Sequence, residues 1–378
     1  MTETIFTNAR VILHNDLIDG TVTIAAGTIV DVQPGRSHAP GAIDLAGDYL
    51  MPGVVDVHTD NLERQVQPRT NARWPSRSAM MAHDAQCAAA GVTTVLDALC
   101  LGDLGFDVGR HQTFLDGVTD LDALADTGLL KSEHFLHLRC EMPAKNVLEL
   151  LDPVADHARV RMISLMDHSP GVGQYASLDR YRALKRREGL TDDVIERRIV
   201  MLTEQRTRYR AANRCGLLTR IGQRDVALAS HDDETIDEIR ENVADSIMIS
   251  EFPVTLLAAT EARRHGMQVV AGAPNIVRGG SHSGNVGAAE LVRARAVDAF
   301  ASDYVPAALI EAAFLCADAG DVTLPAAIAM LTDVPARMVH LPDRGRIARD
   351  LRADLVRVHV HQGMPVTRQV WRAGERVA

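Results

Sequence analysis

The middle of the chain, from about residue 52 to 335, alternates short apolar runs with stretches of helical periodicity. Eight strands alternating with helices predict a parallel α/β fold, most economically a (β/α)8 barrel of the TIM type. A doubly wound sheet is the alternative, but no GxGxxG follows the first run. The eight runs predicted to be strands are VVDVH (54–58), TTVLDAL (93–99), HFLHLRC (134–140), RMISLMD (161–167), DVALAS (225–230), SIMIS (246–250), QVVAGA (268–273) and AFAS (299–302).

The two ends of the chain show a different pattern. Val, Ile and Thr runs broken by Gly, Asn-Asp and Pro-Gly fill residues 1–51, and a hairpin-like pattern fills 339–378. We therefore expect a small β-sandwich built from both termini (1–51 and 339–378) around a barrel domain at 52–338. Residues 175–222 form a charged insertion of one or two amphipathic helices. It could be a lid over the barrel or a solvated hairpin that supports a homo-oligomer.

Composition narrows the classes of partner. The 378 residues are 46% hydrophobic, 4% aromatic and 24% charged, with a net charge of −10. These values argue against a nucleic-acid surface, although a local arginine cluster for one phosphorylated ligand is compatible with them. Five scattered cysteines without a CxxC pair predict reduced thiols and a cytoplasmic location. No signal-peptide pattern and no run of about 18 apolar residues is visible, so no membrane association is expected.

Titratable residues follow most of the predicted strands. In an α/β barrel the carboxyl ends of the strands form the active-site face, so these side chains should converge. His58 and Asp60 are two residues apart on a strand and can face the same ion. Histidines and carboxylates gathered in one ring need a cation to neutralise them, which indicates zinc, manganese or iron. The predicted ligand set is His58, Asp60, Glu141, His168, His231 and Asp303.

Two of these ligands have further expected roles. Glu141 could bridge two metal ions about 3.5–4 Å apart. Asp303 is the expected general base, and the alternative for it is a partner that orients a ligand histidine.

Several other polar residues leave alternatives open. His282, in GGSHSGN, is a candidate general acid, metal ligand or phosphate donor, or an ordinary turn residue. Asp232 and Asp233 either orient His231 or cap the helix that follows, with capping expected for at least one of them. His83 and Asp84 are expected to face the barrel mouth or solvent. The arginines considered for phosphate binding are Arg64, Arg69, Arg73, Arg77, Arg139 and Arg278, with Arg69 and Arg278 preferred.

Longer motifs resemble a known group of enzymes. The segment DLAGDYLMPGVVDVHTD and ADLV near residue 353 resemble the amidohydrolase superfamily, and the resemblance covers essentially the whole chain. HTDNLE, SLMDHSPG, LASHDDET and GAPNIVRGGSHSGN resemble, more specifically, the PhnM-type family of phosphonate metabolism. The resemblance implies hydrolysis of α-D-ribose 1-methylphosphonate 5-triphosphate to the 5-phosphate and pyrophosphate in the carbon–phosphorus lyase pathway. It also implies one or two bound zinc ions, held by the six ligands above, and a substrate-entry loop containing Asn61.

This chain departs from the commonest superfamily pattern at two positions. Asp60 stands where the second histidine of an H-x-H pair is usual, and Glu141 stands in for the usual carboxylated lysine. Two other functions therefore stay open. One is hydrolysis of a cyclic amide or deamination of a nucleobase, and the other is a non-catalytic part of a phosphonate-degrading assembly.

Overall fold

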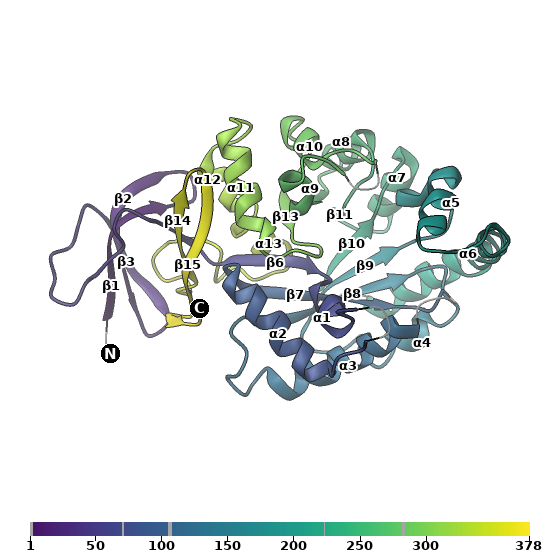
Figure 1. The fold of residues 1–378 in the computed structure, drawn as a ribbon, viewed down its shortest axis with the longest axis horizontal. Helices are drawn as coiled ribbons and strands as arrows, with labels where there is room; N and C mark the ends of the chain where they lie inside the picture. The colour runs from purple at the N-terminus through teal and green to yellow at the C-terminus, as the bar shows by residue number, and fades with distance from the viewer. Residues whose placement is uncertain (1–2, 70–71, 105–107, 223, 282–283) are drawn as a thin grey trace.

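The central barrel is present as predicted. The computed structural model describes residues 3–69, 72–104, 108–222, 224–281 and 284–378. Within them, eight parallel strands lie side by side in chain order, from β6 to β13 (Figure 1). They are β6 (Val54–Thr59), β7 (Val92–Leu101), β8 (Glu133–Glu141), β9 (Val160–Met166), β10 (Ala227–His231), β11 (Ile249–Glu251), β12 (Gln268–Gly272) and β13 (Ala299–Ala301). Each corresponds to one of the eight apolar runs.

The first and last barrel strands meet at the predicted site. A parallel bridge joins Thr59 to Asp303. The Asp303 amide donates to the His58 carbonyl at 3.0 Å, and the Asp60 amide donates to the Asp303 carbonyl at 2.8 Å. The backbone bonds that close the barrel therefore also fix the spacing between three residues of the predicted ligand set.

The strands form because they are buried on both faces. All residues of β6 and β7 are buried, which requires near-continuous apolar runs in a parallel sheet. Inside the barrel, side chains such as Val57, Leu96, Met162 and Val270 pack into one cluster. The barrel is thus a filled core, and polar side chains are left to its ends.

Helices cover the outside of the barrel and make up most of the connections (Figure 1). Those between strands are α1 (Asn61–Val66), α2 (Ser76–Ala89), α3 (Val108–Leu124), α4 (Val147–Leu151), the 3-10 turn η1 (Gly173–Tyr175), α5 (Leu178–Arg187), α6 (Asp192–Ile221), α7 (Ile236–Ala244), α8 (Leu256–Arg264), α9 (Ala273–Val277) and α10 (Ala288–Arg293). Helices α11 (Ala308–Asp318), α12 (Leu324–Ala329) and α13 (Asp333–Met338) follow the last strand. No described helix has the length and apolar character needed to cross a membrane.

Both termini build one separate mixed sheet, as expected from the sequence. It contains β1 (Glu3–Ile12), β2 (Leu17–Ala25), β3 (Thr28–Pro34), β4 (Ile43–Asp44) and β5 (Tyr49–Pro52), with β14 (Leu355–His361), β15 (Met364–Arg372) and β16 (Glu375–Arg376). The antiparallel pair β5 and β14 joins the two ends of the chain. Because β5 runs almost directly into β6, this sheet fixes where the first barrel strand begins.

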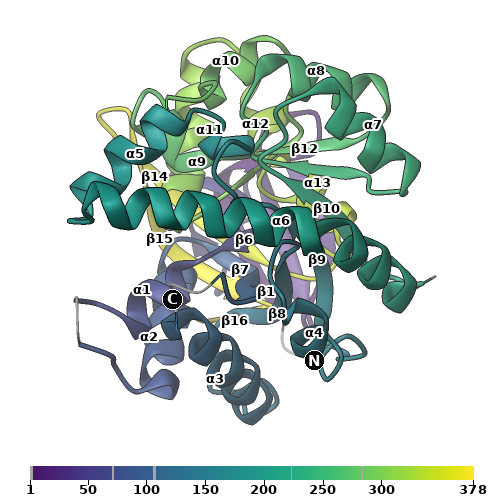
Figure 2. The same cartoon turned by 90° about the vertical axis from the view of Figure 1, so that its right-hand side faces the viewer.

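The charged insertion forms two helices, α5 and α6. Helix α6 runs across the face farthest from the terminal sheet (Figure 2). Arginines spaced four residues apart attach it to the barrel: Arg206 pairs with Asp167 at 2.7 Å, and Arg210 pairs with Glu241 at 2.6 Å. The insertion is therefore docked against the end of β9, directly before His168.

A buried polar network holds α2 against β7 and β8. Asp97 accepts from His83 at 2.7 Å and from His134 at 2.8 Å, and Asp84 accepts from His134 at 3.2 Å. Asn61, at the start of α1, lies 3.0 Å from the other ring nitrogen of His83. Both expectations for His83 and Asp84, barrel mouth or solvent, are wrong, since both are fully buried in this network. Apolar neighbours force these groups to satisfy one another.

The network predicts a loss of stability at alkaline pH. Although burial alone would lower it, the carboxylates of Asp97 and Asp84 raise the pKa of His134 to about 9 from 6.5. A raised pKa means that the folded chain binds the proton more tightly than the unfolded chain does. The stabilisation is therefore full below pH 6.5 and is lost as the pH rises through about 9. Urea unfolding from about pH 7 to 10 should show a loss of roughly 2–3 kcal/mol, which His134→Gln should largely remove. An equal pH slope in both proteins would contradict this role of His134.

Candidate metal centre

A cavity of about 370 Å³ opens at the carboxyl ends of the barrel strands. Such a position is the usual active-site location in an α/β barrel. All six residues of the predicted ligand set line this one cavity: His58, Asp60, Glu141, His168, His231 and Asp303. The structure thus brings together residues that lie up to 245 positions apart, from His58 to Asp303.

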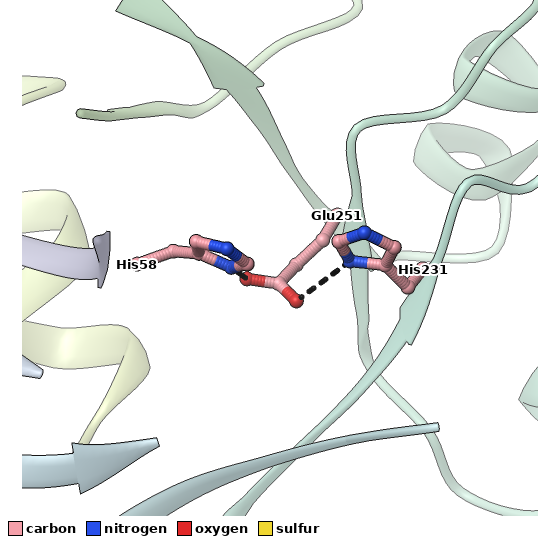
Figure 3. Close-up of side chains that lie close together, drawn as sticks. All are labelled: His58, His231 and Glu251. Carbon is pink, nitrogen blue, oxygen red and sulfur yellow. Dashed lines mark hydrogen bonds and ion pairs between the residues drawn. The ribbon is translucent and has the colours of Figure 1, made fainter. Parts of the chain in front are cut away.

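The side chain of Glu251, at the end of β11, lies between His58 and His231 (Figure 3). His58 Nδ1 is 3.0 Å from Glu251 Oε1, and His231 Nδ1 is 3.4 Å from Oε2. Ser164 Oγ donates to the same Oε2 at 2.5 Å. Glu251 has no solvent exposure, and although burial opposes ionisation, the nearby histidines hold its pKa well below its usual range. An ionised carboxylate only accepts hydrogen bonds, so each ring carries its proton on Nδ1.

This arrangement leaves the Nε2 atoms for another partner. His58 Nε2 and Asp60 Oδ1 are buried, 3.8 Å apart, and neither has a hydrogen-bond partner among the described residues. Asp303 completes a group in which one ligand atom from each residue lies within 4.8 Å of the others. Imidazole nitrogen and carboxylate oxygen are suitable donors for zinc, manganese or iron. The residues therefore fit a divalent metal ion at this position.

A second donor group lies next to the first. It consists of His168, His231 and Asp232, again within 4.8 Å of one another. The His168 and His231 rings have centroids 5.6 Å apart, and His231 stacks on His58 at 5.7 Å. Glu141 contacts His168 through Nδ1. Glu141, the residue expected to bridge two metals, belongs to neither of these two donor groups.

The carboxylates of the cavity differ in how easily they ionise. Burial raises the pKa of Asp303 to about 7, and repulsion from Asp60 adds to the rise. Burial acts in the same direction on Asp60, but Arg139, 3.1 Å away, and His58 hold the pKa of Asp60 below its usual range. So many buried charges repel one another unless a cation neutralises them. The electrostatics of the cavity thus favour a bound metal, in agreement with the donor atoms.

Only one of the predicted phosphate-binding arginines lies in the cavity. Arg139, on β8, lines it, whereas Arg64, Arg69 and Arg278 are exposed and lie outside its lining. Arg64 instead donates to the Tyr304 carbonyl at 2.7 Å. Asn61 is buried and contacts His83 and Gln86, so its amide faces α2. His282 lies outside the described residues.

Three residues that sequence reasoning did not select are part of this site. Glu251 was visible as a carboxylate at a strand end, the same signal that identified Glu141. Arg110 and Lys185 line the cavity from α3 and α5. Neither follows a predicted strand, and Lys185 lies in a segment dense in arginine and glutamate, so the strand-end pattern did not select them.

The expectation of helix capping by Asp232 or Asp233 is wrong. The N-cap of α7 is Thr235, which forms a capping box with Glu238. Asp233 is buried and accepts from Ser230, Ser250 and Asn242.

The fold is that of amidohydrolase-type enzymes. Solved structures with TM-scores of 0.62–0.64 cover 99–100% of this chain at 13–18% identity. They are N-isopropylammelide isopropylaminohydrolase from Burkholderia multivorans (98% of that chain), dihydropyrimidinase from Brevibacillus agri (95%) and N-acetyl-D-glucosamine-6-phosphate deacetylase from Mycobacterium smegmatis (100%). These likenesses show the fold, and enzymes of this fold generally use divalent metals. No family model matches the chain.

A full-length relative gives the family. The chain is 39% identical over 376 residues to alpha-D-ribose 1-methylphosphonate 5-triphosphate diphosphatase of Escherichia coli (strain K12), covering 99% of this chain and 100% of the relative. The chain therefore belongs to the alpha-D-ribose 1-methylphosphonate 5-triphosphate diphosphatase family and is an enzyme, a hydrolase.

Because Glu251 contacts both His58 and His231, its substitution should lower the affinity of the site for metal. In Glu251→Gln one amide would face two Nδ1–H groups and a serine hydroxyl, and it cannot accept from all three. We expect zinc affinity, measured by competition with a chelator, to fall about 10–100-fold. Glu149→Gln, on the exposed side of α4, should leave the affinity unchanged. Wild-type affinity in Glu251→Gln would show that this carboxylate does not orient the histidines.

Proposed function

We propose that this protein hydrolyses alpha-D-ribose 1-methylphosphonate 5-triphosphate to the 5-phosphate and pyrophosphate, in the carbon–phosphorus lyase pathway of phosphonate degradation. The observation that carries the proposal is the 39% identity, over both full lengths, to a diphosphatase of that substrate. The cavity supports it, because histidine and carboxylate donors lie beside a buried arginine. Zinc is the metal we expect, with manganese or iron as alternatives. The metal-ligand roles of His58, Asp60, His168, His231 and Asp303 are part of this proposal.

The negative charge of the cavity explains why binding of the triphosphate should require a bound metal. Asp60, Glu141, Asp232 and Asp303 all line the cavity, so without a cation it would repel a triphosphate. A bound divalent metal supplies a Lewis acid that polarises the phosphoryl group and neutralises charge. Arg139 adds a fixed cation, since it is buried and its Nε has no hydrogen-bond partner among the described residues. Its guanidinium can therefore bind a phosphate oxygen.

Asp303 is the residue we propose as general base. Its backbone is held by hydrogen bonds to His58 and Asp60, and its φ of 54° is rare outside glycine. Strained conformations of this kind are concentrated at active sites. From this position its carboxylate would take a proton from the attacking water and return it to the pyrophosphate leaving group. His282 remains a candidate general acid.

The insertion supplies further candidate substrate contacts. Tyr181 and Lys185, on α5, line the cavity together with Tyr175. The Lys185 ammonium lies 5.9 Å and 5.7 Å from the centroids of the Tyr175 and Tyr181 rings and pairs with Glu188 at 2.9 Å. We propose that it binds the phosphates farthest from the ribose. A cytoplasmic location and a homo-oligomer remain expectations, as does the absence of nucleic-acid binding.

The reaction can be tested by following its products. Metal-loaded protein should convert the triphosphate to pyrophosphate and the 5-phosphate, detected by phosphorus NMR. Asp303→Asn should lower kcat by at least about 10²-fold, because Asn cannot accept the proton. Asp126→Asn, whose side chain is 88% exposed, is the control and should match the wild type. Ammonia release or ring opening of a dihydropyrimidine, with the triphosphate intact, would contradict the proposal.

The proposed role of Lys185 gives a separate prediction. Lys185→Ala should raise KM for the triphosphate roughly tenfold and change kcat little, because the lost contact is remote from the reacting phosphorus. Arg187→Ala removes an exposed charge from the same helix and should leave KM unchanged. Equal KM values for the two variants would remove Lys185 from the substrate site.

A further inference from the structure

We infer that Asp232 is a metal ligand, which completes a second metal site with His168 and His231. In the same site Glu141 acts by orienting His168 and is not a bridge between metals. The inference rests on the proposed metal-dependent function and deepens it. It assigns a ligand that neither the strand-end pattern nor the resemblance to relatives selected.

The distances suit a single ion. Asp232 Oδ2 lies 3.6 Å from His168 Nε2 and 3.9 Å from His231 Nε2. Tetrahedral bonds of about 2.0–2.2 Å would place two ligand atoms about 3.3–3.6 Å apart, so small side-chain movements would complete the site. Asp232 is only 9% exposed, and its Oδ2 has no hydrogen-bond partner among the described residues. A buried carboxylate oxygen without a donor requires an explanation, and a cation between the rings provides one.

The backbone at Asp232 is held in an unusual conformation. Its φ is 58°, in the left-handed region that residues other than glycine seldom adopt. Its amide donates to the Glu251 carbonyl at 2.9 Å. Gly173, two residues before the insertion, packs so closely that a Cβ there would lie 2.9 Å from the Asp232 carbonyl oxygen. Two neighbouring segments therefore fix a turn that sets the carboxylate among the cavity-lining groups.

The adjacent carboxylate shows the contrast. Asp233 accepts from Ser230 Oγ and Ser250 Oγ at 2.5 Å each, and from Asn242 at 2.9 Å. Its hydrogen bonds account for its burial, so it is a structural residue. Of the two aspartates that follow His231, Asp232 is the one left with an unused oxygen facing imidazole nitrogens.

Glu141 occupies the opposite side of the His168 ring. One of its oxygens contacts His168 Nδ1, and the other accepts from the His168 amide at 3.4 Å. The two donor groups are thus built alike. In each group a glutamate contacts the Nδ1 atom of a histidine: Glu251 that of His58, and Glu141 that of His168. Each group also contains an aspartate in the left-handed conformation, Asp303 in the first and Asp232 in the second. Carboxylates that orient ligand histidines in this way are common in metal sites.

The test measures metal binding by Asp232→Asn, without substrate. Asn tolerates the left-handed conformation and keeps the shape of the side chain, so the fold should persist. Zinc titrated against a chelator should bind to the wild type in two equivalents. In Asp232→Asn one equivalent should bind at least about tenfold more weakly. Asp237→Asn, with a side chain 94% exposed, is the matched control and should bind both equivalents normally.

Glu141→Gln separates ligation from orientation. Gln can still accept from Nδ1, so this variant should keep both equivalents with a smaller loss of affinity than Asp232→Asn shows. The inference is overturned if Asp232→Asn binds two equivalents with wild-type affinity, or if only Glu141→Gln loses one. Pyrophosphate release by the wild type is assayed in parallel. Two bound metals without that activity would reject the proposed function and leave this ligand assignment standing.

Discussion

The carboxylate of Glu251 is the interaction on which the site depends. It contacts Nδ1 of both His58 and His231, and its own charge is kept in a position without solvent by those rings and by Ser164. A histidine has two nitrogens, and fixing one decides what the other can reach. By holding both rings from one side, Glu251 directs their Nε2 atoms into the cavity. Because Glu251 lies at the end of the short strand β11, the barrel backbone fixes the distance between the two rings.

Backbone and packing contacts also connect other cavity residues to the barrel fold. Asp303 closes the barrel through backbone bonds to the first strand, so any change in the meeting of β6 and β13 would also move the proposed base. The insertion is held to the barrel through Asp167, next to His168, and Gly173 packs on Asp232. The cavity-lining residues of α5 and of the end of β10 are therefore connected through packed segments.

Much of the fold could be predicted because buried strands have a recognisable pattern of apolar residues in the sequence. Strands buried on both faces need continuous apolar runs. The three-residue strand β13 lies within its recognised run, and β11 overlaps its own run and extends one residue beyond it. The six predicted ligands all reached the cavity because strand ends converge. Pairwise geometry was not predictable. Sequence does not show that Glu141 turns toward His168, that Asp232 adopts a left-handed backbone, or that Arg69 stays exposed, since these outcomes depend on distant packing.

Anomalous diffraction from crystals of zinc-loaded protein tests the central claim most directly. The claim is that Glu251 and Glu141 contact the Nδ1 atoms of the histidines and that the metal ions bind on the Nε2 side. The account predicts two zinc peaks, one among His58, Asp60 and Asp303 and one among His168, His231 and Asp232. Glu251 and Glu141 should be in contact with Nδ1 atoms and outside bonding distance of either peak. A zinc peak bonded to Glu251, or two peaks bridged by Glu141, would contradict it.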